Sequence, residues 1–582
     1  MELLRLAFQH FARRFAASRL LVALALVGVL AGVAVLVAVS IFSSKLAEAG
    51  LRHVLSTTYQ STLDLMVAVQ DRPLGPADYR RVDSLVQDSI QRRIGWMTRG
   101  ARRYGKTQPL TLDGPLPPNE NLATLFFFTG FEDKARLVEG RWPQPSEPGS
   151  LEVVTGAVAA RIMGWRPGDT INMFPYPDDR SLRVPLRITG TVEPQDPGDP
   201  YWVSGLPTFT PYDDGSGRPI APFYLPERIF FDMFGASYPS LVGNFWWLVS
   251  LDASTLNAGN AGAARRELLT LESDINKGLP RSLVLSGMKP TLASYERGLL
   301  LARVPLYLYS GLLALFTLYF LFVVVGLLLA TRQREVALVR SRGGGAGWTV
   351  MLTILGEATV ATGLAIAGGL GLGVLLGHVM VSQLQPIGIE RGPLPGGLTL
   401  WAPGMAILLA VASMAVVMTA AYSLARREAA DLERERARPP RTGVVQRYYL
   451  DLLALAAAAW LWWQVGLRGG FFDFGLDGGL TVDLLSAVGP LLLLLASALA
   501  LIRVFPWALW LLGRTLPTPW ASFAFRRAAR DSGPIGASVA VVFLVAALTT
   551  YGGLLAASLA QGQSDRARYS VGGQIVLQGV SG

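Results

Sequence analysis

One segment of the sequence matches a motif known for binding nucleotide phosphates. Residues 100–107, Gly-Ala-Arg-Arg-Tyr-Gly-Lys-Thr, fit the pattern G-x-x-x-x-G-K-[ST], in which backbone amides and a lysine hold the phosphates of a nucleotide between a strand and a helix. The residues before it, 91–96, do not form a buried-strand pattern, and the residues after it, 107–110, do not open a helix. We therefore interpret the segment as a basic surface loop and not as an ATP site.

The other ionisable residues do not form a catalytic or metal-binding set. The three histidines, at positions 10, 53 and 378, are dispersed, and the absence of cysteine excludes a disulfide framework, a thiolate metal site and a cysteine nucleophile. Carboxylates pair only among prolines and glycines, where solvated turns are expected: Asp178 with Asp179, Asp196 with Asp199, and Asp213 with Asp214. The sequence thus predicts no catalytic residue, no metal site and no cofactor bound by the chain itself.

Long apolar runs characterise the rest of the chain. Hydrophobic residues make up 51% of the sequence and charged residues only 16%, with a mean hydropathy of +0.37, a deviation that is typical of membrane proteins. A helix of about 20 apolar residues crosses the hydrocarbon core. Seven runs reach this length: Leu20–Phe42, Val304–Ala330, Met351–Val381, Trp401–Leu424, Tyr448–Val465, Leu484–Phe505 and Ile535–Leu559. The first is too long for a signal peptide, so we expect it to be an uncleaved anchor.

The distribution of charge orients these spans. The N-terminal segment and residues 331–349, 426–447 and 514–534 each carry a net charge of +3, whereas residues 383–400 are neutral and residues 466–483 carry −2. Because positive loops remain in the cytoplasm, we expect the N-terminus inside and residues 43–301 outside the cell. The outer segment holds 27 basic and 28 acidic residues, so the overall charge of +10 comes from cytoplasmic loops and gives no indication of nucleic-acid binding.

Two features mark the cytoplasmic face near the second and third spans. Residues 330–343 read Ala-Thr-Arg-Gln-Arg-Glu-Val-Ala-Leu-Val-Arg-Ser-Arg-Gly, a short basic segment between two apolar runs. Glu357 is an acid inside the next predicted span, a position that normally indicates function. A short helix along the cytoplasmic surface would place Glu357 near the membrane interface, and we do not favour a proton relay.

The basic segment resembles the signature of the FtsX-like permease family, in which this loop contacts an ATPase subunit. The resemblance implies ATPase-coupling roles for a set of six residues: Arg332, Arg334, Glu335, Arg340, Arg342 and Gly343. It also implies a coupling or structural role for Glu357. Residues 343–347 are glycine-rich where the family often has a polar helix start, so the docking helix is expected to be short or to begin at Trp348. ATP and Mg would then be bound by the partner ATPase and not by this chain.

The outer segment has mixed secondary-structure patterns, which predict an α+β domain. Strand-like runs are expected at residues 122–128, 151–155, 182–192 and 245–251, and helices at 157–163 and 261–275, with helical stalks at residues 45–70 and 291–301. The order Gly140-Arg141-Trp142-Pro143, strand, helix, Gly168-Asp169-Thr170-Ile171, strand is similar to the external core domain of MacB- and LolCDE-type permeases.

A weak internal repeat suggests tandem organisation. Residues 6–13 align with residues 523–530, with four identities in eight positions, and each stretch precedes an apolar span. We therefore expect residues 574–577 to open a second external domain that three further spans would follow. The alternative is a seven-span protein with a short outer tail.

Residues 4–15 also have the pattern of an amphipathic helix on the inner leaflet.

These observations predict an α-helical polytopic membrane protein with a large α+β extracytoplasmic domain and a tandem repeat cut short at the C-terminus. The expected divisions are residues 1–42 (interfacial helix and first span), 43–301 (external core domain), 302–425 (three-helix permease domain), 426–447 (basic linker), 448–513 (two linker spans) and 514–582 (start of a second repeat).

By resemblance, the chain is a permease subunit in a bacterial or archaeal plasma membrane. Its expected partners are a cytoplasmic ABC ATPase dimer, the lipid bilayer, a second permease copy or further C-terminal half, and an extracytoplasmic substrate: a lipid, lipoprotein, peptide or hydrophobic compound. Regulation of a cell-wall hydrolase is equally open. The alternative from another class is an ATPase-independent sensor or scaffold that binds a ligand or cell-wall enzyme through its external domain.

Overall fold

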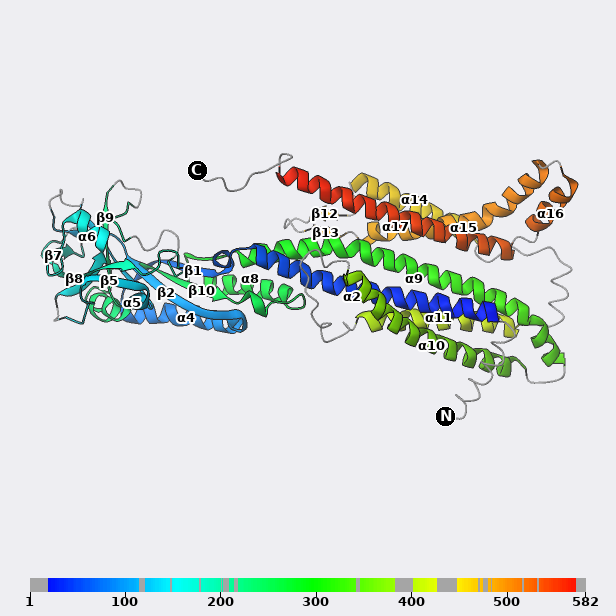
Figure 1. Ribbon diagram of the computed structural model, residues 1–582, viewed down its shortest axis with the longest axis horizontal. Helices are drawn as coiled ribbons and strands as arrows, with labels where there is room; N and C mark the ends of the chain where they lie inside the picture. Colours follow the sequence, from blue (N-terminus) through cyan, green and yellow to red (C-terminus); the bar gives the residue numbers. More distant parts are fainter. Residues whose placement is uncertain are drawn as a thin grey trace. The chain divides into compact units, whose positions relative to one another are not determined.

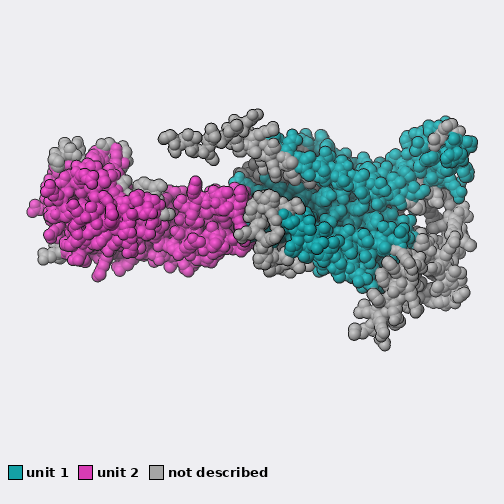
Figure 2. Space-filling view, viewed as in Figure 1, with its two compact units in different colours: residues 1–49, 297–582 teal, residues 50–296 magenta. Residues whose placement is uncertain are grey.

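The computed structural model describes most of the chain and divides it into two compact units. The described residues are 19–114, 121–146, 149–176, 179–199, 201–202, 209–213, 218–341, 346–382, 401–426, 447–468, 472–474, 480–482, 484–515, 518–530 and 533–571. Unit 1 comprises residues 1–49 and 297–582, and unit 2 comprises Gly50–Glu296 (Figure 2).

Unit 1 consists of helices, most of them long and apolar (Figure 1). They are α2 (Arg19–Thr57), α9 (Met288–Ser341), α10 (Ala346–Ser382), α11 (Trp401–Arg426), α14 (Leu450–Arg468), α15 (Leu484–Thr515), α16 (Pro519–Arg530) and α17 (Gly533–Val571), with a hairpin of β12 (Phe472–Phe474) and β13 (Leu480–Val482) between α14 and α15. Five of them, α2, α9, α10, α15 and α17, are long and apolar enough to cross a membrane. The described apolar parts of α11 and α14 are shorter, so the count of seven spans stays a prediction.

Glycines let helix α10 lie directly against helix α2. A Cβ added at Gly369 would lie 2.8 Å from the side chain of Val33, and one at Gly373 would lie 2.7 Å from the Ala34 carbonyl oxygen. Gly377 meets Ile41 one turn further along. Small residues at four-residue spacing allow such close approach between membrane helices. The α10 glycines on this face therefore serve helix packing, whereas Gly363 and Gly371 face open space.

Helix α2 also contacts the neighbouring helices α9 and α11. Gly28 and Gly32 of α2 accommodate Phe320 and Thr317 of α9, and Leu409 of α11 reaches Gly32 as well. The buried cluster around α2 therefore draws on four helices, with these members: Val29, Val33, Leu36, Val37, Ile41, Leu321, Val325, Ala365, Ala406 and Leu409. Helix α2 is the central element of this group.

We predict that a larger side chain at the buried glycines destabilises unit 1. Gly369→Val or Gly373→Val forces a branched side chain into the backbone of α2, and overpacking of this kind costs about 1–3 kcal/mol. Thermal unfolding of the purified chain should therefore begin at a lower temperature. Gly371→Val is the matched control, because a Cβ there meets nothing within 4 Å. An equal loss of stability in all three variants would show that crowding against α2 is not the cause.

Unit 2 is built on one mixed sheet of eleven strands. The strands are β1 (Leu65–Pro73), β2 (Thr98–Thr107), β3 (Leu110–Leu112), β4 (Leu122–Phe128), β5 (Ala135–Gly140), β6 (Leu151–Gly156), β7 (Thr170–Phe174), β8 (Val184–Pro194), β9 (Ile220–Tyr224), β10 (Val242–Leu251) and β11 (Ser282–Ser286). The helical elements are α3 (Gln60–Leu63), α4 (Pro76–Ile94), α5 (Phe131–Lys134), α6 (Ala157–Met163), α7 (Glu227–Ile229), a π-helical turn (Phe230–Gly235) and α8 (Ala261–Gly278).

The sheet has two parts that share strand β4. In the first, strands run in the order β11-β1-β10-β2-β4, all antiparallel, and helices α4 and α8 pack together on this part (Figure 1). Strand β10 alternates between buried and half-buried residues, and Tyr79 of α4 packs against its buried Phe245 and Trp247. In the second part, β4-β3-β7-β8-β6-β9 close into a ring, because β9 pairs with β4 in parallel.

Most of the helices and strands predicted for residues 43–301 are present in the structure, and one predicted helical stalk is wrong in part. The strands β4, β6, β8 and β10 and the helices α6 and α8 lie where the patterns predict them. The helical stalk predicted over residues 45–70 is wrong beyond Thr57, because Leu65–Pro73 forms the strand β1 between β10 and β11. The stalk predicted at residues 291–301 is confirmed as part of α9. The predicted strand at residues 574–577 and the helix at residues 4–15 lie outside the described residues.

Candidate functional site

The predicted ATPase-coupling residues lie at the end of helix α9. Arg332, Arg334, Glu335 and Arg340 all fall within Met288–Ser341, so the segment expected as a loop over residues 331–349 is helical through Ser341. The next helix, α10, begins at Ala346 and contains Glu357. Arg342 and Gly343 lie outside the described residues. The structure therefore assigns the first four residues to one continuous helix.

The beginning of helix α9 is held firmly within unit 2. Met288 and Leu292 are fully buried there, and the Lys289 ammonium lies 2.6 Å from the carboxylate of Glu272 on α8. About two turns later, Glu296 pairs with Arg265 of α8 at 2.8 Å. The amide of Gly287, just before the helix, donates to the Thr62 carbonyl. Burial and two ion pairs thus fix the first turns of α9 to the external domain.

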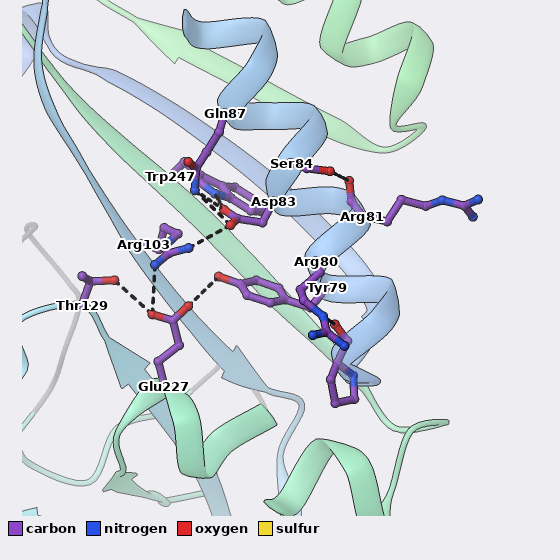
Figure 3. A network of polar contacts seen from close by, with 11 residues as sticks. Tyr79, Arg80, Arg81, Asp83, Ser84, Gln87, Arg103, Thr129, Glu227 and Trp247 are labelled. Carbon is purple, nitrogen blue, oxygen red and sulfur yellow. Dashed lines mark hydrogen bonds and ion pairs between the residues drawn. The ribbon is translucent and has the colours of Figure 1, made fainter. Parts of the chain in front are cut away.

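A network of charged side chains crosses unit 2 where the two parts of its sheet meet (Figure 3). Arg103 of β2 donates to Asp83 of α4 at 2.8 Å and to Glu227 at the start of α7 at 3.4 Å. Tyr79 and Thr129 also donate to Glu227, at 3.3 and 3.4 Å. Trp247 Nε1 and Gln87 both donate to Asp83. One guanidinium therefore bridges carboxylates from two separate segments.

Burial shapes the electrostatics of this network. The Asp83 and Glu227 side chains are 16% and 26% exposed. Burial, together with the negative charges of Glu227 and Asp83, raises the pKa of the Tyr79 hydroxyl well above its usual range. Tyr79 therefore stays protonated and serves as a hydrogen-bond donor. The donors named above satisfy both carboxylates, so we interpret the network as a structural brace.

We predict that removing the bridging cation destabilises the external domain. Arg103→Met leaves two half-buried carboxylates without their cation, which costs about 2 kcal/mol, less than for a fully buried pair. Thermal unfolding of the purified chain measures the effect. Arg102→Met is the neighbouring control, because its guanidinium stacks over the Tyr201 ring at 5.3 Å, a weaker contact. The interpretation fails if both variants unfold at the temperature of the unmodified chain.

A second ion pair, between Arg141 and Glu152, stabilises the Gly-Arg-x-Pro turn at residues 140–143. Gly140 adopts a positive φ of 83°, which favours glycine. Arg141 then donates through Nη1 and Nη2 to the two oxygens of Glu152 on β6, at 2.7 and 2.5 Å. The amide of Gln144 adds a third hydrogen bond to Glu152 at 3.0 Å. The hydrogen bonds from Arg141, followed by that from Gln144, lower the pKa of the Glu152 carboxyl below its usual value.

This lowered pKa predicts how stability depends on pH. The carboxylate of Glu152 stabilises the folded chain above the unfolded pKa of about 4.3. That contribution is lost as the pH falls through the lower folded value. Glu152→Gln should therefore unfold earlier than the unmodified chain at pH 7, and the two unfolding temperatures should converge as the pH approaches 3. Glu193→Gln serves as the control, since its pair with Arg136 is exposed. A constant difference across this pH range would contradict the assignment.

The apparent phosphate-binding motif is part of a strand. Residues 98–107 form β2, which pairs antiparallel with β10 along its length. A Cβ added at Gly105 would lie 2.5 Å from the Phe127 ring and 2.6 Å from the Phe245 ring, so this glycine makes room for aromatic packing. The Lys106 ammonium lies 5.5 Å from the centre of the Tyr212 ring. The segment is therefore a strand and not the basic surface loop predicted from the sequence, and it does not form the turn between a strand and a helix that the motif requires.

Among the predicted carboxylate pairs, Asp196 and Asp199 lie together in a turn, whereas Asp178 and Asp214 lie outside the described residues. Asp179 accepts from the amide and hydroxyl of Ser181, and Asp196 accepts from the amide of Gly198. Asp199 accepts from the Tyr201 amide and from Lys134, whose ammonium lowers the pKa of the carboxyl. No group of three or more metal-ligating side chains occurs among the described residues.

Sequence reasoning missed an ion pair within the apolar helices of unit 1. Arg503 of α15 lies 2.9 Å from both carboxylate oxygens of Asp451 near the start of α14, and Asp451 is only 1% exposed. The Tyr449 ring packs over the same guanidinium at 4.8 Å. The available signal was the pair of opposite charges in two neighbouring apolar runs, since such residues pair with one another within membranes.

Comparison with known proteins adds one distant structural similarity. No protein-family model matches the chain, and no curated protein matches its sequence. Among solved structures, the crystal structure of the periplasmic region of MacB from Actinobacillus actinomycetemcomitans aligns over 40% of this chain and 94% of that chain. The sequence identity is 14% and the TM-score 0.22, values too low to carry an argument about fold or function.

The architecture itself defines a general class of protein. Five helices are long and apolar enough to span a membrane, and residues 50–296 form a folded domain around a mixed sheet. The chain is therefore a membrane protein with a large α/β domain outside the hydrocarbon core.

Proposed function

We propose that the chain is the membrane permease of an ABC transporter of the FtsX/MacB type, driven by a separate cytoplasmic ATPase. ATP hydrolysis by that ATPase would move the external domain, which in turn would move or extract a lipid, lipoprotein, peptide or hydrophobic compound. The observation that carries the proposal is helix α9, which is continuous over 54 residues from Met288 to Ser341. No other described helix is as long.

Helix α9 has the properties of a mechanical connection. Its first turns belong to unit 2, where burial and the pairs of Lys289 and Glu296 hold them. Its last turns carry the basic residues between Arg332 and Arg340. In the proposed transporter this helix, which has Pro305 in its interior, would connect its two ends, and packed helical elements of this kind can carry coupling between distant sites. A force on the basic end would therefore act on the domain at the other end.

The charge pattern favours a protein partner at the basic end. Arg332, Arg334, Glu335 and Arg340 lie within about the last three turns of α9, next to an apolar span. Such an array can dock into a groove through charge-assisted hydrogen bonds. In the proposed complex, a dimer of ATPase subunits binds ATP and Mg, and a second permease copy or a further C-terminal half completes the membrane part. The N-terminus and residues 331–349 would lie in the cytoplasm of a bacterial or archaeal cell.

We predict that an ATPase co-purifies with the chain from its native membranes and that the complex hydrolyses Mg-ATP. Glu335→Ala together with Arg340→Ala should reduce the amount of bound ATPase by about tenfold or more, because charge-assisted contacts are lost. The matched control is Asp88→Ala with Arg92→Ala, an exposed acid and base one turn apart on α4. Both variants should extract and migrate as the unmodified chain does.

The same experiment distinguishes the proposed permease from the alternative class, an ATPase-independent sensor or scaffold. An unmodified chain that purifies without an ATPase and without ATP hydrolysis would overturn the proposal and favour an ATPase-independent sensor or scaffold. An ATPase that is retained equally by the double variant and the control would leave a permease, but would reject the end of α9 as the docking site.

A further inference from the structure

Helix α16 is a short, basic helix between two apolar helices. The apolar part of α15 ends at Thr515, α16 spans Pro519–Arg530, and the apolar part of α17 begins at Ile535. The Ser522 hydroxyl donates to the Gly513 carbonyl at 2.6 Å, and Ala521 is 6% exposed. These contacts fix α16 against the end of α15. Because it joins the ends of two apolar helices, α16 lies at the boundary of the hydrocarbon core.

The free face of α16 combines aromatic rings with arginines. Trp520 and Phe523 are 76% and 68% exposed, and they lie one turn apart. Arg526, Arg527 and Arg530 are exposed on the following turns, whereas Ala521, Ser522 and Phe525 lie on the more covered side. Exposure of two large rings on a soluble surface would be unfavourable. At a membrane interface, the same rings enter the headgroup region, where tryptophan is enriched.

The charge of this surface has one sign. Residues 514–530 contain four arginines and neither Asp nor Glu. Among the described residues, none of the arginines of α16 forms an ion pair. Arg514 stacks over the Trp510 ring of α15 at 5.6 Å, and Trp507 and Trp510 are themselves exposed. Exposed aromatic rings and arginines therefore occur both at the end of α15 and on α16.

We propose that this surface, Trp507, Trp510, Arg514 and the exposed face of α16, binds the headgroups of anionic phospholipids. The rings anchor the helix at the level of the headgroups, and the arginines pair with phosphate and other negative groups. Arginine suits this task because its planar fork donates two hydrogen bonds to a phosphate. An acidic protein surface would complement the arginines equally well, but it would not account for Trp520 and Phe523. The inference is independent of the proposed function.

The absence of cysteine allows a local test in the full chain. Ala524→Cys places a single label on the exposed face of α16. The spin-labelled protein is reconstituted in nanodiscs of phosphatidylcholine, with and without phosphatidylglycerol of the same acyl chains. The measured quantity is the ratio of collision rates with oxygen, which partitions into lipid, and with a water-soluble nickel chelate. Phosphatidylglycerol should raise this ratio and slow the motion of the label.

Substitutions separate the headgroup contact from simple proximity to the bilayer. Arg526→Gln, Arg527→Gln and Arg530→Gln together should abolish the response to phosphatidylglycerol. The matched control removes three exposed arginines from helix α4 of unit 2, Arg80→Gln, Arg81→Gln and Arg92→Gln, and should keep the full response. Trp520→Ser should lower the ratio in both lipid mixtures. If the triple variant of α16 fails to fold, high salt should reverse the response of the singly labelled chain, because it screens exposed charges.

Two results would overturn the proposal. The first is a label that the nickel chelate reaches freely in both lipid mixtures, which would favour α16 as a docking surface for an acidic protein. The second is a response to phosphatidylglycerol that is absent in the labelled chain, or that persists unchanged in the triple variant.

Discussion

The contact between helices α2 and α10 is the constraint on which the membrane part of the chain depends. Lipid chains are as apolar as the side chains they touch, so burial alone does not hold membrane helices together. Close packing must supply the attraction, and it requires backbones that approach one another. Gly369, Gly373 and Gly377 provide that approach along three turns of α2. Helix α2 can then contact α9 and α11 on its other sides and organise the group.

In the external domain, ion pairs hold separate segments together, as close helix packing does in the membrane part. The sheet buries long runs of apolar residues, but its two parts and its turns are joined by arginine–carboxylate pairs. Arg103 connects Asp83 with Glu227, and Arg141 closes the turn onto Glu152. Each pair links segments that are separate in the sequence, so each restricts how the parts of the sheet can move. In the proposed transporter such joints would help the domain to transmit force, since they are directional and apolar packing is not.

The sequence predicts the elements of this protein better than their connections. Apolar run length located the long helices because hydrocarbon thickness sets their length. Strand β2 escaped prediction because its charged residues obscure the alternation, and their acceptors, Asp83 on α4 and Glu227 on α7, lie elsewhere in the chain. The parallel pairing of β4 with β9 joins residues about 100 positions apart, which no local pattern encodes. Of the coupling residues, sequence and structure together fix the helical position of Arg332 to Arg340 and leave their partner to experiment.

The first turn of α9 has a consequence for solubility. Strand β11 pairs only with β1 among the described strands, so its outer edge is open to another strand. The Lys289 ammonium lies 3.3 Å from the Val284 carbonyl oxygen of this strand while it pairs with Glu272. A lysine at an open edge discourages strand addition and aggregation. The residue that helps to fasten α9 to the external domain therefore also occupies one acceptor that an added strand would need.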